Sequence, residues 1–229
     1  MVDFCSDVNF ANVVDVPDYS IEELTPFVLA EWIRTFYETK WIFSTNGAIG
    51  TIQSGFLFLT PANIAGNNIE KDTNFVYDVT TKDLLFEPAN SQLTPCATVI
   101  AYLLQLTRCS TVIHTCSEAS IEVTRMQEGN FVLQVSGNEC IKGVWDFYKN
   151  AHYVINDTLC IPIIENERNE EELLKSLKTL FEYPIPSCAV LIRGRGLYVW
   201  GPSWELAKTS CENIENILEE EFLTLSLIL

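Results

Sequence analysis

The sequence predicts an α/β domain in which helices cover a mixed or antiparallel sheet. The chain has 229 residues, of which 48% are hydrophobic and 20% are charged, so it carries enough apolar side chains for one full core. Strand-like apolar runs and amphipathic segments follow one another without a strict strand–helix–strand repeat. We expect an irregular leader at residues 1–19 and a single domain at residues 20–229.

The first predicted helix lies directly after the leader. Ser20 and Glu23 have the capping-box spacing, in which each side chain accepts a hydrogen bond from the other residue's backbone N–H. Large apolar residues then recur at every fourth position from Leu24 to Phe36. This period predicts an amphipathic helix that ends at about Tyr37.

The later elements are predicted from short apolar runs, amphipathic periods and helix caps. The glycine-containing segment Ser44–Gly50 is predicted to be a turn. Strands are predicted at Phe56–Leu59, Phe75–Val79, Thr111–His114, Phe131–Val135, Leu159–Ile164, Ala189–Ile192 and Leu197–Trp200. Helices are predicted at Ala97–Leu106, from Ser117 onward, at Glu170–Phe181, and from Trp204 onward with Ser203 as the cap.

Charge and cysteine usage exclude several classes of function. The net charge of -17 argues against nucleic acid and against an anionic membrane surface as partners, because both need clustered Lys and Arg. The eight cysteines include no Cys-x-x-Cys pair, which predicts free thiols and not a zinc ribbon or a disulfide scaffold. The N-terminal residues lack the features of a signal peptide, and no apolar run approaches the ~20 residues that span a bilayer. We therefore expect a cytoplasmic protein.

His114 and Cys116 are the first candidates for chemistry. They end a predicted strand, and side chains two residues apart on a strand point to the same side. Both could therefore reach one metal ion. Judged on these residues alone, a packed His–Cys pair without a metal is the commoner arrangement.

The segment Cys188–Cys211 contains a buried strand, an Arg-Gly-Arg-Gly turn, a second strand and a capped helix. It resembles the C-terminal signature of the class II aldolase/adducin family. The segment Ile161–Asn166 also resembles that family, and the likeness extends over about residues 24–222. The resemblance implies a three-layer α/β/α fold with a central mixed, mostly antiparallel sheet. It also implies a tetramer with active sites between subunits. The most similar branch holds zinc-dependent dehydratases that remove water from a phosphorylated ketose in methionine salvage.

The resemblance places zinc ligands at three positions that have changed here. The family's His-x-His pair matches His114 and Cys116, and its third histidine matches Arg195. A cysteine thiolate ligates zinc at about 2.3 Å, but an arginine has no lone pair to offer. Two unit charges about 4 Å apart repel by roughly 4 kcal/mol at an effective dielectric near 20, and a dication doubles this. We therefore expect zinc, the family's cofactor, to bind weakly or not at all.

The family's acid/base glutamate matches Glu139 in the segment Asn138–Gly143. A dehydratase needs such a carboxylate to move a proton while the hydroxyl group leaves. Because Arg195 carries a permanent charge, it could replace the zinc charge and form a salt bridge with Glu139 or with a Cys116 thiolate.

The resemblance also implies a phosphate site. The loop that includes Thr45, Asn46 and Gly47 matches the family's glycine-rich phosphate loop, although Gly50 stands where the dehydratases have a serine. Ser91 matches a second phosphate-contact region. Glycine-rich loops are common, so this loop is a weak signal by itself.

These observations leave three hypotheses. The first is a divergent copy with impaired or absent zinc-dependent catalysis, which binds a phosphorylated sugar or assembles into homo-oligomers or into mixed oligomers with an active relative. The second is an active zinc dehydratase that uses His114, Cys116 and an unidentified third ligand. The third is metal-free chemistry on a phosphosugar. The apolar tail Phe222–Leu229 is expected to pack on the chain's own core or on a partner subunit.

Overall fold

The computed structural model describes residues 24–43, 46–62, 69–70, 73–185 and 187–227. Its strands are β1 Ala48–Gln53, β2 Phe56–Leu59, β3 Phe75–Asp78, β4 Leu84–Phe86, β5 Thr111–Thr115, β6 Val132–Ser136, β7 Trp145–Asp146, β8 Ala151–His152, β9 Thr158–Ile164, β10 Ala189–Ile192 and β11 Gly196–Gly201. Its helices are α1 Pro26–Glu38, α2 Ala97–Thr107, α3 Glu118–Met126, α4 Glu170–Leu180 and α5 Trp204–Ser226, with a 3-10 turn, η3, at Glu139–Gly143.

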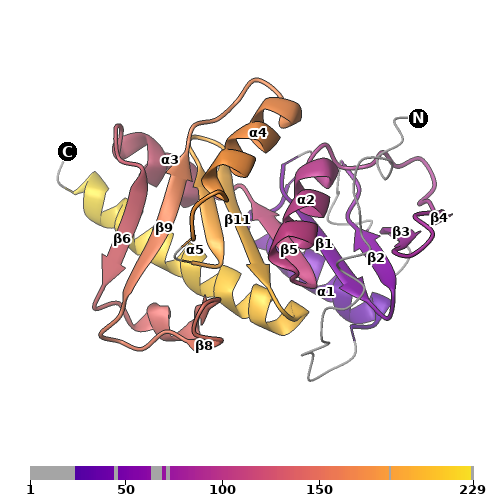
Figure 1. The fold of residues 1–229 in the computed structure, drawn as a ribbon, viewed down its shortest axis with the longest axis horizontal. Coiled ribbons are helices and arrows are strands. Elements are labelled where there is room, and N and C mark those ends of the chain that lie inside the picture. The colour runs from indigo at the N-terminus through magenta and orange to yellow at the C-terminus, as the bar shows by residue number, and fades with distance from the viewer. Residues whose placement is uncertain (1–23, 44–45, 63–68, 71–72, 186, 228–229) are drawn as a thin grey trace.

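One sheet of nine strands forms the middle of the domain, in the order β4-β3-β2-β1-β5-β11-β10-β9-β6. Only β9 and β10 pair in parallel; the other neighbours in this sheet are antiparallel. Helices α2 and α4 cover one face, and α1, α3 and α5 cover the other (Figure 1). The structure therefore confirms the predicted three-layer α/β/α fold with a mixed, mostly antiparallel sheet.

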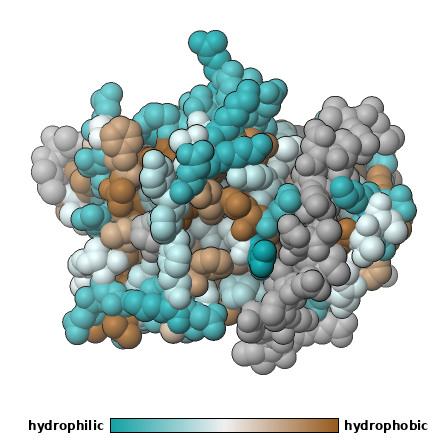
Figure 2. All heavy atoms as spheres, in the orientation of Figure 1, coloured by the Kyte–Doolittle hydropathy of each residue, from teal (hydrophilic) through white to brown (hydrophobic). Residues whose placement is uncertain are grey.

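The centre of the sheet is also the centre of the core. Every residue of β5, β10 and β11 is buried, because helices cover both faces of these strands. The charged surface lies outside this layer: hydrophilic side chains cover α4 and the loop before it (Figure 2). Among the described helices, none is both long enough and apolar enough to cross a bilayer.

The start of the chain's first helix differs from the prediction. Helix α1 begins at Pro26, and the Thr25 hydroxyl accepts a hydrogen bond from the Val28 N–H at 3.3 Å. Proline fits the first helical position because its missing N–H would have no partner there. The predicted capping box at Ser20 and Glu23, like the leader at residues 1–19, lies outside the described residues.

The predicted turn at residues 44–50 is wrong at its C-terminal end. Strand β1 already begins at Ala48, so Gly50 lies within a strand and not in the turn. A Cβ atom on Gly50 would lie 2.3 Å from the Ile100 side chain of α2. The glycine therefore lets α2 pack close to the sheet, and a serine here would collide with that helix.

Most of the other predicted strands and helices are confirmed within one or two residues. Strands β4, β7 and β8 are two or three residues long and were missed, because so short a run has no readable period. The C-terminal helix continues to Ser226, with Phe222 and Leu225 packed on the chain's own core. Leu223 and Leu227 on the same helix remain 63% and 88% exposed.

Candidate functional site

A cavity of about 330 Å³ lies at the end of β5. Segments far apart in the sequence meet there: the approach to β1, the start of α2, the first turn of α3 and the turn between β10 and β11. Its lining residues are Asn46, Gly47, Pro95, Cys96, His114, Cys116, Ile121, Asn166, Gly194 and Arg195. The cavity therefore combines a thiol–imidazole pair, a second thiol, two amides and one guanidinium.

The His114 side chain is held in one orientation. It is buried, its ring stacks on the Tyr198 ring with the centroids 4.0 Å apart, and its Nδ1 lies 3.0 Å from the Leu197 carbonyl oxygen. Because a carbonyl only accepts hydrogen bonds, Nδ1 carries the proton and donates it. In the neutral imidazole Nε2 is then the nitrogen without a proton, and it faces the Cys116 Sγ at 3.4 Å.

Cys116 follows directly after β5 and is 5% exposed. Its backbone N–H donates to the Trp41 carbonyl oxygen at 2.8 Å. The residues on either side of it, Thr115 and Ser117, both donate from their hydroxyls to the buried Glu215 carboxylate of α5. The structure thus confirms that His114 and Cys116 point to the same side of the strand.

The turn between β10 and β11 brings Arg195 to the cavity. Its backbone N–H donates to the Ile192 carbonyl oxygen at 3.0 Å, which closes the turn. Gly196 follows with φ +138°, and a Cβ atom there would lie 2.1 Å from the Thr115 carbonyl oxygen. Only glycine permits this backbone conformation and this close approach to β5.

The Arg195 guanidinium forms an ion pair with Glu170, the first residue of α4, and lies 4.0 Å from the Cys96 Sγ. The predicted salt bridge to Glu139 or to a Cys116 thiolate is therefore wrong. Burial opposes the charge on Arg195, but the nearby Tyr198 and Glu170 outweigh burial and raise its pKa. The guanidinium thus keeps its charge inside the cavity.

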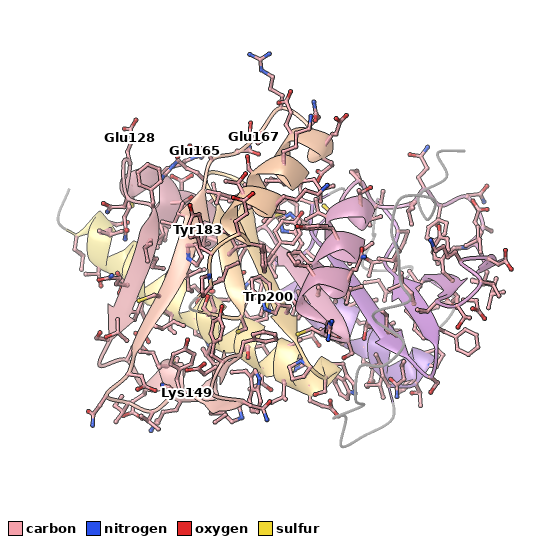
Figure 3. The ribbon with its side chains drawn as sticks, viewed as in Figure 1. Glu128, Lys149, Glu165, Glu167, Tyr183 and Trp200 are labelled. Atoms are coloured by element: carbon pink, nitrogen blue, oxygen red, sulfur yellow. The ribbon has the colours of Figure 1, made fainter. Side chains whose placement is uncertain are left out.

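The other arginine of the turn has a different role. Arg193 donates to the Thr124 and Gln127 carbonyl oxygens at the end of α3 and to the Asn130 carbonyl oxygen just after it, and its Nε donates to Glu165 at 2.8 Å. It therefore satisfies the free carbonyls of a helix C-terminus. Figure 3 shows Glu165 at the same end of the sheet as Glu128 and Glu167.

Glu139 does not line this cavity. It lies in η3 with its side chain 73% exposed, and its carboxylate forms an ion pair with Lys142 one turn along. The chain folds Glu139 onto the surface near the end of α5, where Asn138 bonds to Glu220 at 2.7 Å. The catalytic role of Glu139 stays a prediction. It requires that Glu139 reach the cavity of another subunit, because Glu139 does not line the cavity of its own chain.

The predicted phosphate residues are divided. Asn46 and Gly47 line the cavity, with Gly47 at φ +86°, and Thr45 lies outside the described residues. Ser91 instead lines a neighbouring, larger cavity of about 750 Å³ beside β3 and β4, which shares Pro95 with the His114 cavity. The structure therefore does not bring Ser91 to the His114 cavity.

Three polar residues around the site were missed. Glu170 and Cys96 approach Arg195 from α4 and the start of α2, contacts that no local pattern predicts. Glu215 had a readable signal, because it lies between Cys211 and Leu218 on the apolar stripe of α5. A glutamate at a buried helical position needs partners, and here the two hydroxyls of the β5 end supply them.

The side chains at the cavity do not fit a zinc ion. Structural and catalytic zinc sites use at least three protein ligands, from His, Cys, Asp and Glu. Nowhere in the described part of the chain do three such side chains converge closely enough to hold a metal. His114 and Cys116 provide two, and the side chain at the third position is the Arg195 guanidinium, which repels a cation.

The three-layer fold and the comparisons with known proteins together define the class of protein. The chain matches the Class II Aldolase and Adducin N-terminal domain over residues 28–222, and it belongs to that family. It is 34% identical over 188 residues to the methylthioribulose-1-phosphate dehydratase of Gallus gallus, covering 81% of this chain and 77% of that protein. It is 32% identical over 189 residues to the methylthioribulose-1-phosphate dehydratase of Mus musculus, covering 81% and 78%.

Solved structures support the same fold. An L-fuculose 1-phosphate aldolase aligns with a TM-score of 0.60 at 13% identity, covering 87% of this chain and 85% of that chain. The L-fuculose-1-phosphate aldolase from Thermus thermophilus aligns with a TM-score of 0.54 at 15% identity, covering 86% and 90%. Identities this low carry the fold alone.

Proposed function

We propose that this chain is a divergent relative of methylthioribulose-1-phosphate dehydratase that binds a small phosphorylated sugar without a resident zinc ion. Its dehydratase activity is impaired or absent, and it acts by binding or by assembly. The observation that carries the proposal is Arg195, whose guanidinium lines the same cavity as His114 and Cys116 and stands where the family resemblance places a third zinc ligand.

The cavity favours an anion at only one place. Its charged lining residue is Arg195, and Glu170 balances that charge. Asn46 and Gly47 also line the cavity, in the loop that resembles the family's phosphate loop. A phosphate group would therefore bind through amide and backbone donors as well as through the guanidinium.

One observation favours the second hypothesis, an active zinc dehydratase. The Leu197 carbonyl accepts from His114 Nδ1 and leaves Nε2 beside the Cys116 Sγ, which is how backbone carbonyls orient metal-binding histidines. A third ligand from outside the described residues or from another subunit would complete such a site.

Metal content and turnover separate the two hypotheses. We expect the purified chain to contain little zinc and to dehydrate methylthioribulose 1-phosphate far more slowly than an active relative measured alongside. The double variant C116H/R195H should regain zinc, because it restores the three histidines, whereas C116H alone should not. Stoichiometric zinc together with turnover in the unmodified chain would establish the active dehydratase instead.

Ligand binding is tested separately by calorimetry with methylthioribulose 1-phosphate and with inorganic phosphate. We expect Asn46→Asp to weaken binding by about tenfold or more, because it adds a negative charge to the cavity wall. Ser91→Asp, in the neighbouring cavity, is the matched control and should leave the affinity unchanged. Equal effects of the two variants would contradict this site.

Assembly and location are further parts of the proposal. Light scattering of the purified chain, alone and mixed with an active dehydratase, tests for homo-oligomers and mixed oligomers. A cytoplasmic location is proposed from the free thiols, which persist in a reducing compartment, and imaging of a tagged chain tests it.

A further inference from the structure

We infer that Cys116 and His114 form a nucleophilic thiol–imidazole pair that reacts with small electrophilic carbonyl compounds entering the cavity. This inference rests on the zinc-free part of the proposed function, but it requires neither a phosphosugar nor the absence of dehydratase activity. It assigns a role to the residue that departs from the family's His-x-His pattern.

The first requirement is a base within reach of the thiol. His114 Nε2 lies 3.4 Å from Cys116 Sγ, and in the neutral ring it is the nitrogen that can accept a proton, because Nδ1 donates to the Leu197 carbonyl oxygen. A nucleophile, a base, and a third group that orients the base are the parts of an activated thiol. Here the Leu197 carbonyl is the orienting group.

The second requirement is rigidity. The Tyr198 ring, stacked on His114, prevents the imidazole from turning away. The backbone of Cys116 is fixed by Trp41, and its two neighbours are fixed by Glu215. The pair is therefore preorganised before any ligand arrives, which is what a reactive site needs.

The third requirement is space and a group that holds the electrophile. Both residues line a cavity of about 330 Å³, and Arg195 lines it too as a hydrogen-bond donor for a carbonyl oxygen. Tyr198 lies beside the same wall: it is fully buried, and its side chain neighbours Cys96 and Arg195.

The reaction with an α-halo carbonyl balances without any further reagent. The Cys116 sulfur forms a bond to the carbon next to the carbonyl group, and the carbon–halogen bond breaks. The halide leaves with the electron pair, and the thiol proton passes to His114 Nε2 and then to solvent.

Cys96 provides an internal control, because it lines the same cavity without a neighbouring imidazole. Burial raises the pKa of the Cys96 thiol, and the negative charge of Glu170 raises it further. Cys96 should therefore react slowly with a reagent that reaches both thiols.

The experiment is alkylation of the full-length chain by iodoacetamide in the presence of a chelator, with the rate at each cysteine followed by peptide mass spectrometry. We expect Cys116 to react at least about tenfold faster than Cys96, and His114→Gln to remove most of that advantage, since a positioned base contributes about a hundredfold. Partial unfolding of the variant would raise both rates, so the expected result is a fall in the Cys116 rate while the Cys96 rate in the same sample stays unchanged.

Three results would overturn the inference. They are equal rates at Cys116 and Cys96, an unchanged Cys116 rate in His114→Gln, or no modification of Cys116 while the partly exposed Cys140 and Cys160 react. A failure of the zinc-free proposal looks different: Cys116 would be protected without the chelator and reactive with it.

Discussion

The two sides of the β5 end differ in how their polar groups are satisfied. On the side facing α5, Thr115 and Ser117 both donate to the buried carboxyl group of Glu215, so these polar groups satisfy one another. On the cavity side, His114 and Cys116 contact each other and line the cavity, and Arg195 also lines it. The polar groups on the α5 side stabilise the fold, whereas those on the cavity side are placed to contact a ligand that enters the cavity.

This comparison indicates which parts of the family pattern can change. The residues facing α5 hold the strand in place, so their loss affects the whole fold. The residues facing the cavity bear on ligand chemistry, so exchanges such as those at positions 116 and 195 leave the fold intact. The site can therefore diverge while the scaffold is preserved.

The sharpest way to break the α5 side is Glu215→Leu. The change leaves two buried hydroxyls without their acceptor, and each such group costs ~1–3 kcal/mol, so we expect a loss of about 4 kcal/mol in the free energy of unfolding. Urea denaturation measures it. Glu219→Leu, on an exposed position one turn further along the same helix, is the matched control and should cost no more than about 0.5 kcal/mol.

The pH dependence of stability tests the same carboxyl group. Burial raises the pKa of Glu215 to about 7 from an ordinary value of 4.5. The folded chain therefore keeps this proton over a range in which the unfolded chain has released it. The contribution to stability is complete below about pH 4.5 and is lost as the pH rises through about 7.

The size of this effect follows from the shift and is on the order of 3 kcal/mol. We expect Glu215→Gln to abolish it, since an amide does not titrate. The measurement is the difference in unfolding free energy between the two proteins from pH 4.5 to pH 8. A constant difference across this range would show that Glu215 does not change protonation on folding.

The two arginines of the β10–β11 turn sharpen the comparison. Arg193→Met should cost about 2 kcal/mol of stability, because it removes the donors that satisfy the end of α3. Arg195→Met should cost about 1 kcal/mol, because its ion pair with Glu170 is partly exposed. Thermal denaturation of both variants checks the order, and a larger loss for Arg195→Met would contradict it.

The smallest expected effect on stability lies at the cavity. Cys116→Ser keeps a small polar side chain beside His114 and should change the unfolding free energy by less than about 1 kcal/mol. The same change should abolish fast alkylation at that position. A large loss of stability would instead mean that Cys116 belongs to the scaffold.

Local patterns predicted more of the fold than of the site. The spacing of apolar residues and the capping residues located β5, α2 and α4, because the apolar pattern extends over the full length of each of these elements. Strand β1 was hidden, because Gly50 suggests a turn while in fact making room for α2.

The site depended on contacts between distant residues. The spacing of His114 and Cys116 was enough to place both on one side of a strand. Arg195 pairs with Glu170, which lies 25 residues away in the sequence, and Thr115 bonds to Glu215, which lies 100 residues away. Only the fold brings these residues together. Family resemblance placed Arg195 near His114 and Cys116, but the salt bridge expected from its charge, to Glu139 or to a Cys116 thiolate, is made to Glu170.

The zinc content of the purified protein tests the central claim most directly. Elemental analysis after purification without chelator should find zinc far below one ion per chain, and added zinc should not raise the melting temperature. One zinc ion per chain that disappears in His114→Gln and in Cys116→Ser would contradict the account, because it would show that the cavity still holds the family's metal beside Arg195.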